Sequence, residues 1–223
     1  MSFNIAIDGP AGAGKSTIAK QAAKALGFVY VDTGAMYRAL GLYFMRKGIA
    51  AECEAAIIGA LADIDVSIRY EDGDQKVILN GEDVSTQIRT EAVGNMASAT
   101  SGYPKVREKL LELQQQMAAA YDVIMDGRDI GTNILPNADI KIYLTASAVE
   151  RAARRCKEYD EKGIAYDYDK VRQDIIERDE RDKNRATAPL KQAEDAIYLD
   201  TSDMNIQQVV DYILNLYREK CDK

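Results

Sequence analysis

The sequence predicts an α/β fold in which helices and a five-stranded parallel sheet form three α/β/α layers, with a small antiparallel β insertion. Three observations predict it. A glycine-rich loop joins a short apolar strand to a helix near the N-terminus, short apolar runs then alternate with helical patterns, and two turn signals interrupt the alternation. The 223 residues suit one domain with a smaller lobe.

The first elements follow from apolar spacing and from the glycines between them. Residues 4–8 form a short apolar run, and residues 15–26 place apolar side chains at helical spacing before the next glycine. A second strand pattern at 28–31 is followed by helical patterns at 35–47 and 52–62. This strand–helix alternation is typical of a parallel sheet covered by helices.

The β insertion is predicted between residues 65 and 85, where apolar and polar side chains alternate. Asp72-Gly73 and Asn80-Gly81 are dipeptides that favour the positive φ angles of tight hairpin turns. Two such turns predict three short antiparallel strands.

The second half returns to the α/β pattern. Pro104 is tolerated in a first helical turn and opens a long helical pattern, and nearly all-apolar strands follow, as expected for strands buried on both faces. The predicted elements are helices at 104–120, 148–162, 169–183 and 206–217, and strands at 123–125, 140–144 and 197–199.

Residues 9–16 have the phosphate-loop pattern Gly-x-x-x-x-Gly-Lys-Ser between a strand and a helix, the context this motif requires. Its glycines allow backbone N–H groups to surround a polyphosphate at a helix N-terminus. Lys15 adds a charge for the β- and γ-phosphates, and the Ser16 hydroxyl is a candidate Mg²⁺ ligand. The residues expected to bind the donor nucleotide are Gly9, Pro10, Ala11, Gly12, Ala13, Gly14, Lys15, Ser16 and Thr17.

The alternative to a functional loop is a glycine-rich turn formed by chance. Switch GTPases share this loop, but the Asn-Lys-x-Asp guanine-recognition motif that they need is absent from the sequence. The loop therefore favours a kinase or an ATPase.

Composition limits the partners and the chemistry. A net charge of −7 with a pI near 4.9 gives no general attraction to nucleic acid or to anionic membranes, so any phosphate site must be local. No signal peptide or apolar membrane span is evident, and we expect a cytoplasmic protein. The three cysteines, Cys53, Cys156 and Cys221, are far apart and are expected to be free thiols.

The chain contains no histidine, which excludes Ser-His-Asp and Cys-His catalysis and phosphohistidine intermediates. An acceptor that is itself a phosphate monoester needs no catalytic base, because it is mostly dianionic at neutral pH. The missing histidines therefore fit phosphoryl transfer to another phosphate.

Arg178, Arg181 and Arg185 are predicted to share one stripe of a helix, with Asp182 between them, at about 100° per residue. An ordinary solvated face is the alternative, and an ion pair of Asp174 with Arg178 would fit it. Like-charged neighbours repel unless an anion lies between them, and guanidinium groups suit phosphate oxygens. The stripe therefore favours a phosphate site.

The segment Asp126-Gly127-Arg128-Asp129 directly follows a predicted strand, at the sheet edge where α/β proteins bind ligands. An ordinary strand-to-loop turn is the alternative. Two carboxylates around a guanidinium suit contact with Mg²⁺ and phosphate better.

Together these motifs resemble the bacterial cytidylate kinases, P-loop nucleoside monophosphate kinases that act on CMP and dCMP in pyrimidine nucleotide metabolism. The resemblance runs through nearly the whole chain. It is carried by Ile7–Ser16, Asp32–Arg38, Arg89–Val93, Asp126–Thr132 and Glu177–Arg185.

The resemblance implies a single kinase domain over 1–223, with a monophosphate-binding lobe at about 33–103 that contains the β insertion, and a short helical lid at about 151–165. It implies ATP as phosphoryl donor, Mg²⁺, and CMP or dCMP as acceptor. The sequence does not decide which lid arginine contacts phosphate: Arg151, Arg154 or Arg155.

The resemblance also implies roles for single residues. Cytosine recognition falls to Ser98, Arg107 and Asp129, and the acceptor phosphate to Arg38, Arg128 and Arg185. The sugar falls to Asp182 with Arg178 nearby, Thr33 stands where the family commonly has serine, and Asp126 completes the substrate site. The residues expected to act in catalysis are Lys15, Arg128, Arg178 and Arg185.

A carboxylate can accept a hydrogen bond from the exocyclic amine of cytosine but faces a carbonyl oxygen in uracil, so we expect weak use of UMP. The alternatives are a kinase of another small acceptor, such as UMP or shikimate, and a nucleotide switch without an acceptor. We expect a monomer that binds neither nucleic acid nor membrane.

Overall fold

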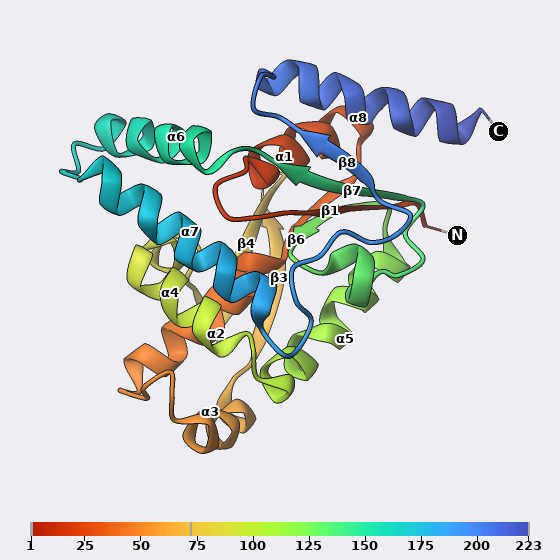
Figure 1. The fold of residues 1–223 in the computed structure, drawn as a ribbon. Helices are drawn as coiled ribbons and strands as arrows, with labels where there is room; N and C mark the ends of the chain where they lie inside the picture. Colours follow the sequence, from red (N-terminus) through yellow and green to blue (C-terminus); the bar gives the residue numbers. More distant parts are fainter. Residues whose placement is uncertain (1, 72, 223) are drawn as a thin grey trace.

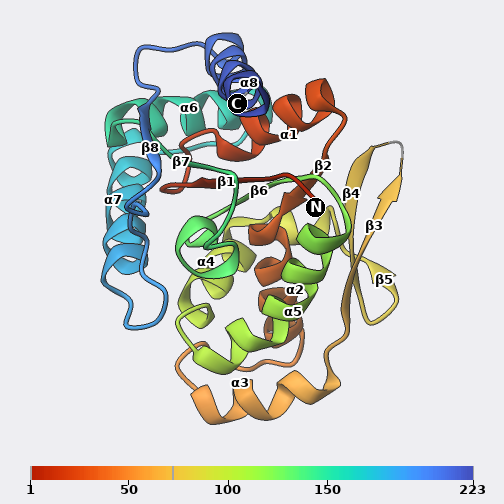
Figure 2. The ribbon, with the colours of Figure 1, turned by 90° about the vertical axis from the view of Figure 1, so that its right-hand side faces the viewer.

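The structure is a computed structural model that describes residues 2–71 and 73–222. Helices cover both faces of a central sheet, and a second small sheet lies beside it (Figures 1 and 2). Asp72 of the predicted hairpin turn, and the two terminal residues of the predicted 1–223 domain, lie outside the described residues. Within the described part of the chain, no helix has both the length and the apolar character that a membrane crossing requires.

The central sheet has five parallel strands in the order β2-β6-β1-β7-β8, which confirms the predicted fold class. Asp8 at the end of β1 pairs with Gly127 and Tyr143, and Asp32 at the end of β2 pairs with Asp126. Three carboxylates therefore meet at one sheet edge. The strands are β1 (Asn4–Asp8), β2 (Val29–Asp32), β6 (Val123–Gly127), β7 (Ile140–Thr145) and β8 (Ile197–Asp200).

Two apolar clusters bind the layers together. Helices α1 (Lys15–Leu26) and α8 (Ile206–Cys221) cover one face, where Ile5 and Ile7 of β1 are fully buried. The intervening Ala6 points to the opposite face, which is covered by α2 (Thr33–Arg46) and α5 (Pro104–Ala120) (Figure 1). This alternation within β1 shows why its sequence is almost wholly apolar: both faces of the strand are buried.

The predicted insertion forms the antiparallel sheet β3 (Val66–Glu71), β4 (Asp74–Leu79) and β5 (Glu82–Asp83). It lies beside the edge strand β2 (Figure 2), where the Gln75 amide accepts from the Asp32 N–H at 2.8 Å and donates to the Asp32 carbonyl at 3.2 Å. Because Gln75 satisfies backbone groups that an edge strand leaves free, the insertion protects this edge.

Of the remaining helices, α4 (Glu91–Thr100), α6 (Ala148–Glu161) and α7 (Tyr168–Asn184) lie near the carboxyl edge of the sheet, and α3 (Glu54–Ala60) lies farther from it (Figure 1). Helices α3 and α4 belong to the segment around the insertion, and α6 and α7 form a pair. Helix α4 was not predicted. All the helices that were predicted are present, with ends shifted by a few residues. One turn of π-helix, Ile130–Ile134, follows β6, and short 3₁₀ turns occupy Leu61–Asp63 and Gln87–Arg89.

Candidate active site

The phosphate loop between β1 and α1 has the backbone that its glycines predict. Gly9 has φ 152°, and a Cβ there would lie 1.9 Å from the carbonyl oxygen of Leu144 on the neighbouring strand. Gly12 and Gly14 have φ values of 74° and 87°, a region that favours glycine, and Gly14 caps α1. The loop therefore ends at a helix N-terminus that carries unpaired N–H groups.

Lys15 is buried beneath the loop, where its Nζ donates to the Pro10 carbonyl at 2.8 Å. Burial lowers its pKa, and the nearby Arg128 charge lowers it further, although Asp126 and Asp8 oppose the change. An anionic ligand in the loop would favour the charged ammonium. A phosphate group held by the loop would be such an anion.

Asp126 at the end of β6 accepts hydrogen bonds from the hydroxyls of Ser16, at 3.0 Å, and Tyr30, at 2.8 Å. Burial raises its pKa, and the neighbouring Asp32 raises it further. A divalent cation would offset both effects. The hydroxyl oxygen of Ser16 and the carboxylate oxygens of Asp126 are also ligands of the kind that Mg²⁺ prefers, so these residues fit the ion.

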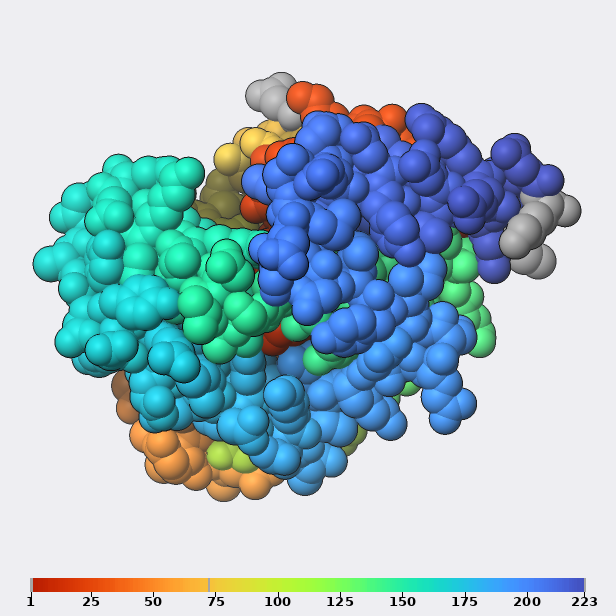
Figure 3. Space-filling model, turned by 45° about the horizontal axis from the view of Figure 1, so that its top comes forward, coloured from red at the N-terminus to blue at the C-terminus, as the bar shows by residue number. Residues whose placement is uncertain are grey.

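A cavity of about 870 Å³ opens above the carboxyl edge of the sheet. In Figure 3 the red N-terminal loop is visible at the bottom of a hollow between the α6–α7 pair and the blue C-terminal segment. Basic side chains outnumber acidic ones in its lining. The cavity therefore has a local positive field that can attract anions, although the chain as a whole is acidic. Apart from Gly9 and Pro10, every predicted site residue lines it: Ala11, Gly12, Ala13, Gly14, Lys15, Ser16, Thr17, Thr33, Arg38, Ser98, Arg107, Asp126, Arg128, Asp129, Arg178, Asp182 and Arg185.

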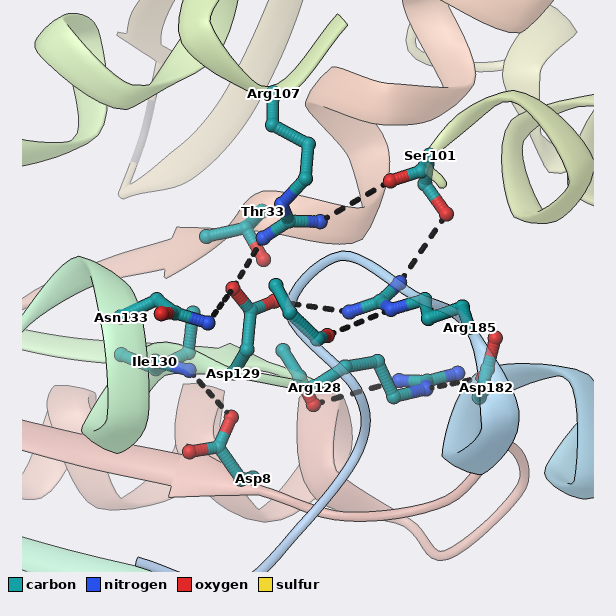
Figure 4. A network of polar contacts seen from close by, with 12 residues as sticks. Asp8, Thr33, Ser101, Arg107, Arg128, Asp129, Ile130, Asn133, Asp182 and Arg185 are labelled. Atoms are coloured by element: carbon teal, nitrogen blue, oxygen red, sulfur yellow. Dashed lines mark hydrogen bonds and ion pairs between the residues drawn. The ribbon is translucent and has the colours of Figure 1, made fainter. Parts of the chain in front are cut away.

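Asp129 is the centre of a polar cluster at the end of the cavity (Figure 4). One carboxylate oxygen accepts from Arg107 and, at 3.2 Å, from Asn133, while the other accepts from Arg185 at 3.2 Å. Ser101 joins the two arginines, because its carbonyl accepts from Arg107 at 3.4 Å and its hydroxyl from Arg185 at 3.2 Å. The carboxylate is therefore held in one orientation.

A second ion pair joins the strand end to α7. Arg128 Nε donates to Asp182 at 2.8 Å, and the Ser98 hydroxyl of α4 donates to the other oxygen of Asp182 at 3.3 Å. Burial acts to raise the pKa of Asp182. The charge and hydrogen bond of Arg128, and to a smaller extent the charges of Arg178 and Arg185, lower this pKa below its usual value overall. Asp182 is thus held ionised.

Arg178 lies beside this pair without a partner for its Nε atom among the described residues. Burial lowers its pKa to about 10, and the Arg128 charge contributes, so Arg178 remains protonated at neutral pH. The predicted stripe is wrong for Arg181, which is exposed and absent from the cavity lining. The helix ends at Asn184, and Arg185 reaches the cavity from an extended residue with ψ 140°.

Arg38 of α2 also reaches the cavity, and its guanidinium donates to the carbonyls of Ile88, at 3.0 Å, and Thr90, at 3.2 Å. Burial lowers the pKa of Arg38, and the charge of Arg89 adds to the effect. The neighbouring Thr33 donates its hydroxyl to the Asp126 carbonyl at 2.7 Å and so ties α2 to β6.

Asp8 is the main site residue that the sequence analysis missed. Its buried carboxylate accepts the N–H groups of Ile130, at 2.7 Å, and Gly131, at 2.8 Å, and so fixes the turn that follows Asp129 (Figure 4). Burial raises its pKa to about 6. A single acidic residue at the end of an apolar strand was the only signal in the sequence.

Several residues that line the cavity were also missed. Arg89 pairs with Asp32 at 3.1 Å, and Tyr37 lies 5.5 Å below the Arg107 guanidinium and faces the same cavity end as Ser101. At the opposite end the lining comes from the β8–α8 connection and the start of α8: Thr201, Met204, Asn205, Ile206, Gln207 and Val209.

The three arginines of α6 have different surroundings. Arg151 is buried, Arg154 donates to the carbonyls of Ala13 and Thr201, and Arg155 lines the cavity beside Glu158. Among them, Arg155 alone has no hydrogen bond to a carbonyl group of the described residues, and its guanidinium lies beside Glu158 and over the Tyr159 ring.

Comparison with known proteins identifies the family of this chain. The model of the cytidylate kinase family matches residues 5–219. The chain is 49% identical over 215 residues to cytidylate kinase of Caldicellulosiruptor bescii, covering 96% of this chain and 95% of that one, and 47% identical over 218 residues to that of Lactobacillus johnsonii, covering 98% and 95%. A crystal structure of an uncharacterized protein from Eubacterium ventriosum shares the fold, with a TM-score of 0.54 at 10% identity over 96% of this chain and 98% of that one. The chain therefore belongs to the cytidylate kinase family.

Proposed function

We infer that this chain is a cytidylate kinase, which transfers the γ-phosphoryl group of ATP to CMP or dCMP. An oxygen of the monophosphate forms a bond to the γ-phosphorus as the bond from that phosphorus to the bridging oxygen breaks, giving ADP and CDP or dCDP. The observation that carries the proposal is one cavity with the phosphate loop on its floor and the Asp129 cluster at an end. A triphosphate donor and a base-bearing acceptor would occupy these two places.

We propose that Lys15, Arg128, Arg178 and Arg185 stabilise the charge that spreads over the phosphoryl oxygens in the transition state. Arg178 suits this role best, because it is buried, charged and lacks a partner for Nε among the described residues. A phosphate oxygen would complete its hydrogen bonds. Arg38 lies close enough to contribute to acceptor binding, together with Arg128 and Arg185.

Cytosine selection is proposed to rest on Asp129, Arg107 and Ser98. The arginines on both sides of Asp129 keep its carboxylate in place, so it can accept from the cytosine amine, whereas the uracil carbonyl would face it unfavourably. Asp182, held by Arg128, is the proposed partner of the acceptor sugar, and Thr33 and Asp126 border the space between acceptor and donor.

Mg²⁺ is proposed as a further component, held by Ser16 and with Asp126 nearby. The ion would supply positive charge to the donor phosphates and would balance the buried Asp126 carboxylate. We further propose a monophosphate-binding lobe at about 33–103, a lid at about 151–165, a monomeric state, a cytoplasmic location, and no binding to nucleic acid or membrane.

The deciding experiment measures ADP formation with ATP and Mg²⁺ in the presence of CMP, dCMP, UMP, AMP, GMP or shikimate. We expect CMP and dCMP to accelerate ADP formation and the others to do so only weakly. Acceleration by shikimate or UMP above that by CMP would indicate another small-molecule kinase. ADP formation at the same rate without any acceptor would indicate a nucleotide switch and would refute the proposal.

A further inference from the structure

Arg151 lies behind the phosphate loop and not inside the cavity. Its side chain is 6% exposed, and each nitrogen of its guanidinium has a partner. Nε donates to the Ala146 carbonyl at 2.9 Å, Nη1 to the Ala11 carbonyl at 3.0 Å, and Nη2 to the Asp179 carboxylate at 2.6 Å. One head group thus connects the loop to both helices of the α6–α7 pair.

The bond to Ala11 fixes the orientation of one loop peptide. In a trans peptide the C=O and N–H groups point in opposite directions, so a carbonyl held against α6 turns the Gly12 N–H away from α6. Gly12 lines the cavity, and backbone N–H groups of this loop are the ones that surround phosphates. A charged donor on the carbonyl also polarises the peptide and makes its N–H a stronger donor.

Arg154 repeats this arrangement one turn further along α6. Its Nη1 donates to the Ala13 carbonyl at 3.3 Å, which orients the next peptide but one of the loop. Residues three apart share a helix face, so the spacing of Arg151 and Arg154 matches two loop carbonyls two residues apart. Arg155 points elsewhere: it pairs with Glu158 at 3.7 Å and lies over the Tyr159 ring.

The Arg151–Asp179 pair is a poor candidate for a purely stabilising contact. The Asp179 side chain is 9% exposed, and its Oδ1 atom has no hydrogen-bond partner among the residues that the structure describes. A buried ion pair with an unsatisfied oxygen is often no more stable than an apolar pair of similar size. Its geometry is better explained by the orientation that it gives to the guanidinium.

We propose that Arg151, held by Asp179, is a positioning residue that points the Gly12 N–H at the phosphates of the donor nucleotide. Helix α7 carries Asp179 toward the loop and Asp182 toward the cavity, so one helix aligns both substrate sites. The proposal rests on the proposed function for the identity of the donor, ATP.

Two variants test the proposal. Arg151→Lys keeps the charge but loses the three-way fork of donors, and the double variant Arg151→Met with Asp179→Leu removes the pair without leaving a buried charge unpaired. We expect the ATP dissociation constant, measured by calorimetry without acceptor, to rise about tenfold and kcat to fall roughly 10- to 100-fold in both. The KM for CMP should stay within about twofold, since the acceptor contacts are untouched.

Two further measurements separate positioning from folding. The Gly12 amide resonance in ¹H–¹⁵N spectra should shift in both variants, while their thermal midpoints show that they are folded. Arg172→Lys, a matched exchange at an exposed position of α7, should leave the resonance, the ATP affinity and kcat unchanged.

Wild-type ATP affinity and an unmoved Gly12 resonance in either folded variant would overturn the proposal. Because both readouts need no acceptor, they remain informative if the wild-type chain fails to phosphorylate CMP, a result that would refute only the proposed function.

Discussion

At the residue scale, the charge of Asp129 is balanced from two sides before any substrate binds. Arg107 and Arg185 donate to different oxygens of its carboxylate, and its side chain is 4% exposed. The arginines therefore act as a fixed frame, and the lone pairs that remain on the carboxylate define what a ligand must offer. That requirement is a hydrogen-bond donor; in the proposed acceptor complex cytosine has one at this position and uracil does not.

Asp129→Asn should consequently erode the preference for CMP over UMP. Because an amide can present its NH₂ group to the uracil carbonyl, we expect the ratio of kcat/KM values for CMP and UMP to fall about tenfold or more, equivalent to ~1–3 kcal/mol of discrimination. The measurement is steady-state kinetics with each acceptor. ATP affinity should not change, and its collapse would show that Asp129 serves the donor site instead.

Glu108→Gln on α5 is the matched control, because Glu108 is exposed, pairs only with Lys105 in the described chain and is absent from the cavity lining. It should leave the ratio intact. Asp129→Asn should also lower the free energy of unfolding by about 1–3 kcal/mol, since two buried arginines lose a charged partner.

The site residues that could be predicted from the sequence differ from those that were missed in how far apart their contacts lie along the chain. Lys15, Ser16 and the 126–129 segment belong to local patterns that follow a strand directly, so their chemistry is visible in sequence. Asp8 acts through bonds to residues 122 and 123 positions away, which no local pattern contains. Arg181 was misplaced for a different reason: the buried face of α7 is centred on Ile175, Asp179 and Asp182, and at about 100° per residue Arg181 lies roughly 120° away from it.

At the element scale, the close approach of α2 and α4 positions Arg38. A Cβ on Gly41 of α2 would lie 3.0 Å from the Ala97 backbone nitrogen of α4, and a Cβ on Gly94 would lie 2.9 Å from the Arg38 guanidinium. Helix α4 was missed because its buried positions, Val93, Gly94, Ala97 and Thr100, include only one large apolar side chain and so give no clear apolar stripe, and packing on α2 stabilises the helix. Sequence periodicity succeeds where a helix has its own apolar stripe, as α1 does.

Gly94→Ala should therefore weaken acceptor binding more than it weakens the fold. The clash falls on the movable end of Arg38, so the guanidinium shifts while the helices stay in place. We expect the KM for CMP to rise roughly 5- to 30-fold, equivalent to ~1–2 kcal/mol, with less than about 1 kcal/mol lost from the free energy of unfolding. Kinetics and urea unfolding measure the two quantities.

Gly59→Ala provides the matched control in α3, where an added Cβ meets nothing within 4 Å. It should leave the KM for CMP unchanged and stabilise the fold by about 0.4–1 kcal/mol, because alanine restricts the unfolded chain. An unchanged KM in Gly94→Ala would show that the Arg38 position does not matter for acceptor binding.

At the scale of the whole molecule, an acidic protein surrounds a basic cavity whose floor contains buried carboxylates. The net charge of −7 comes from the whole chain, whereas the cavity lining carries an excess of arginine and lysine. Asp126 belongs to that lining and Asp8 lies behind it, and burial raises the pKa of each. The site thus carries ionised groups that destabilise the empty fold, which is a common cost of function.

The pH dependence of unfolding should reveal this cost at Asp8. Burial raises its pKa from 3.8 to about 6, so between these values the folded chain holds a proton that the unfolded chain has released. The contribution of Asp8 to stability is therefore present below about pH 4 and is lost as the pH rises through about 6.

Asp8→Asn has no such loss, although it forfeits one of two backbone hydrogen bonds at every pH. The free energy of unfolding of the variant minus that of the wild type should rise by about 3 kcal/mol between pH 4 and pH 7. Urea unfolding at a series of pH values measures this difference, in which the opposite trend from the lowered pKa of Asp182 cancels. The exposed Asp63→Asn should give a constant difference, and a constant difference for Asp8→Asn as well would mean that Asp8 is not held protonated by burial.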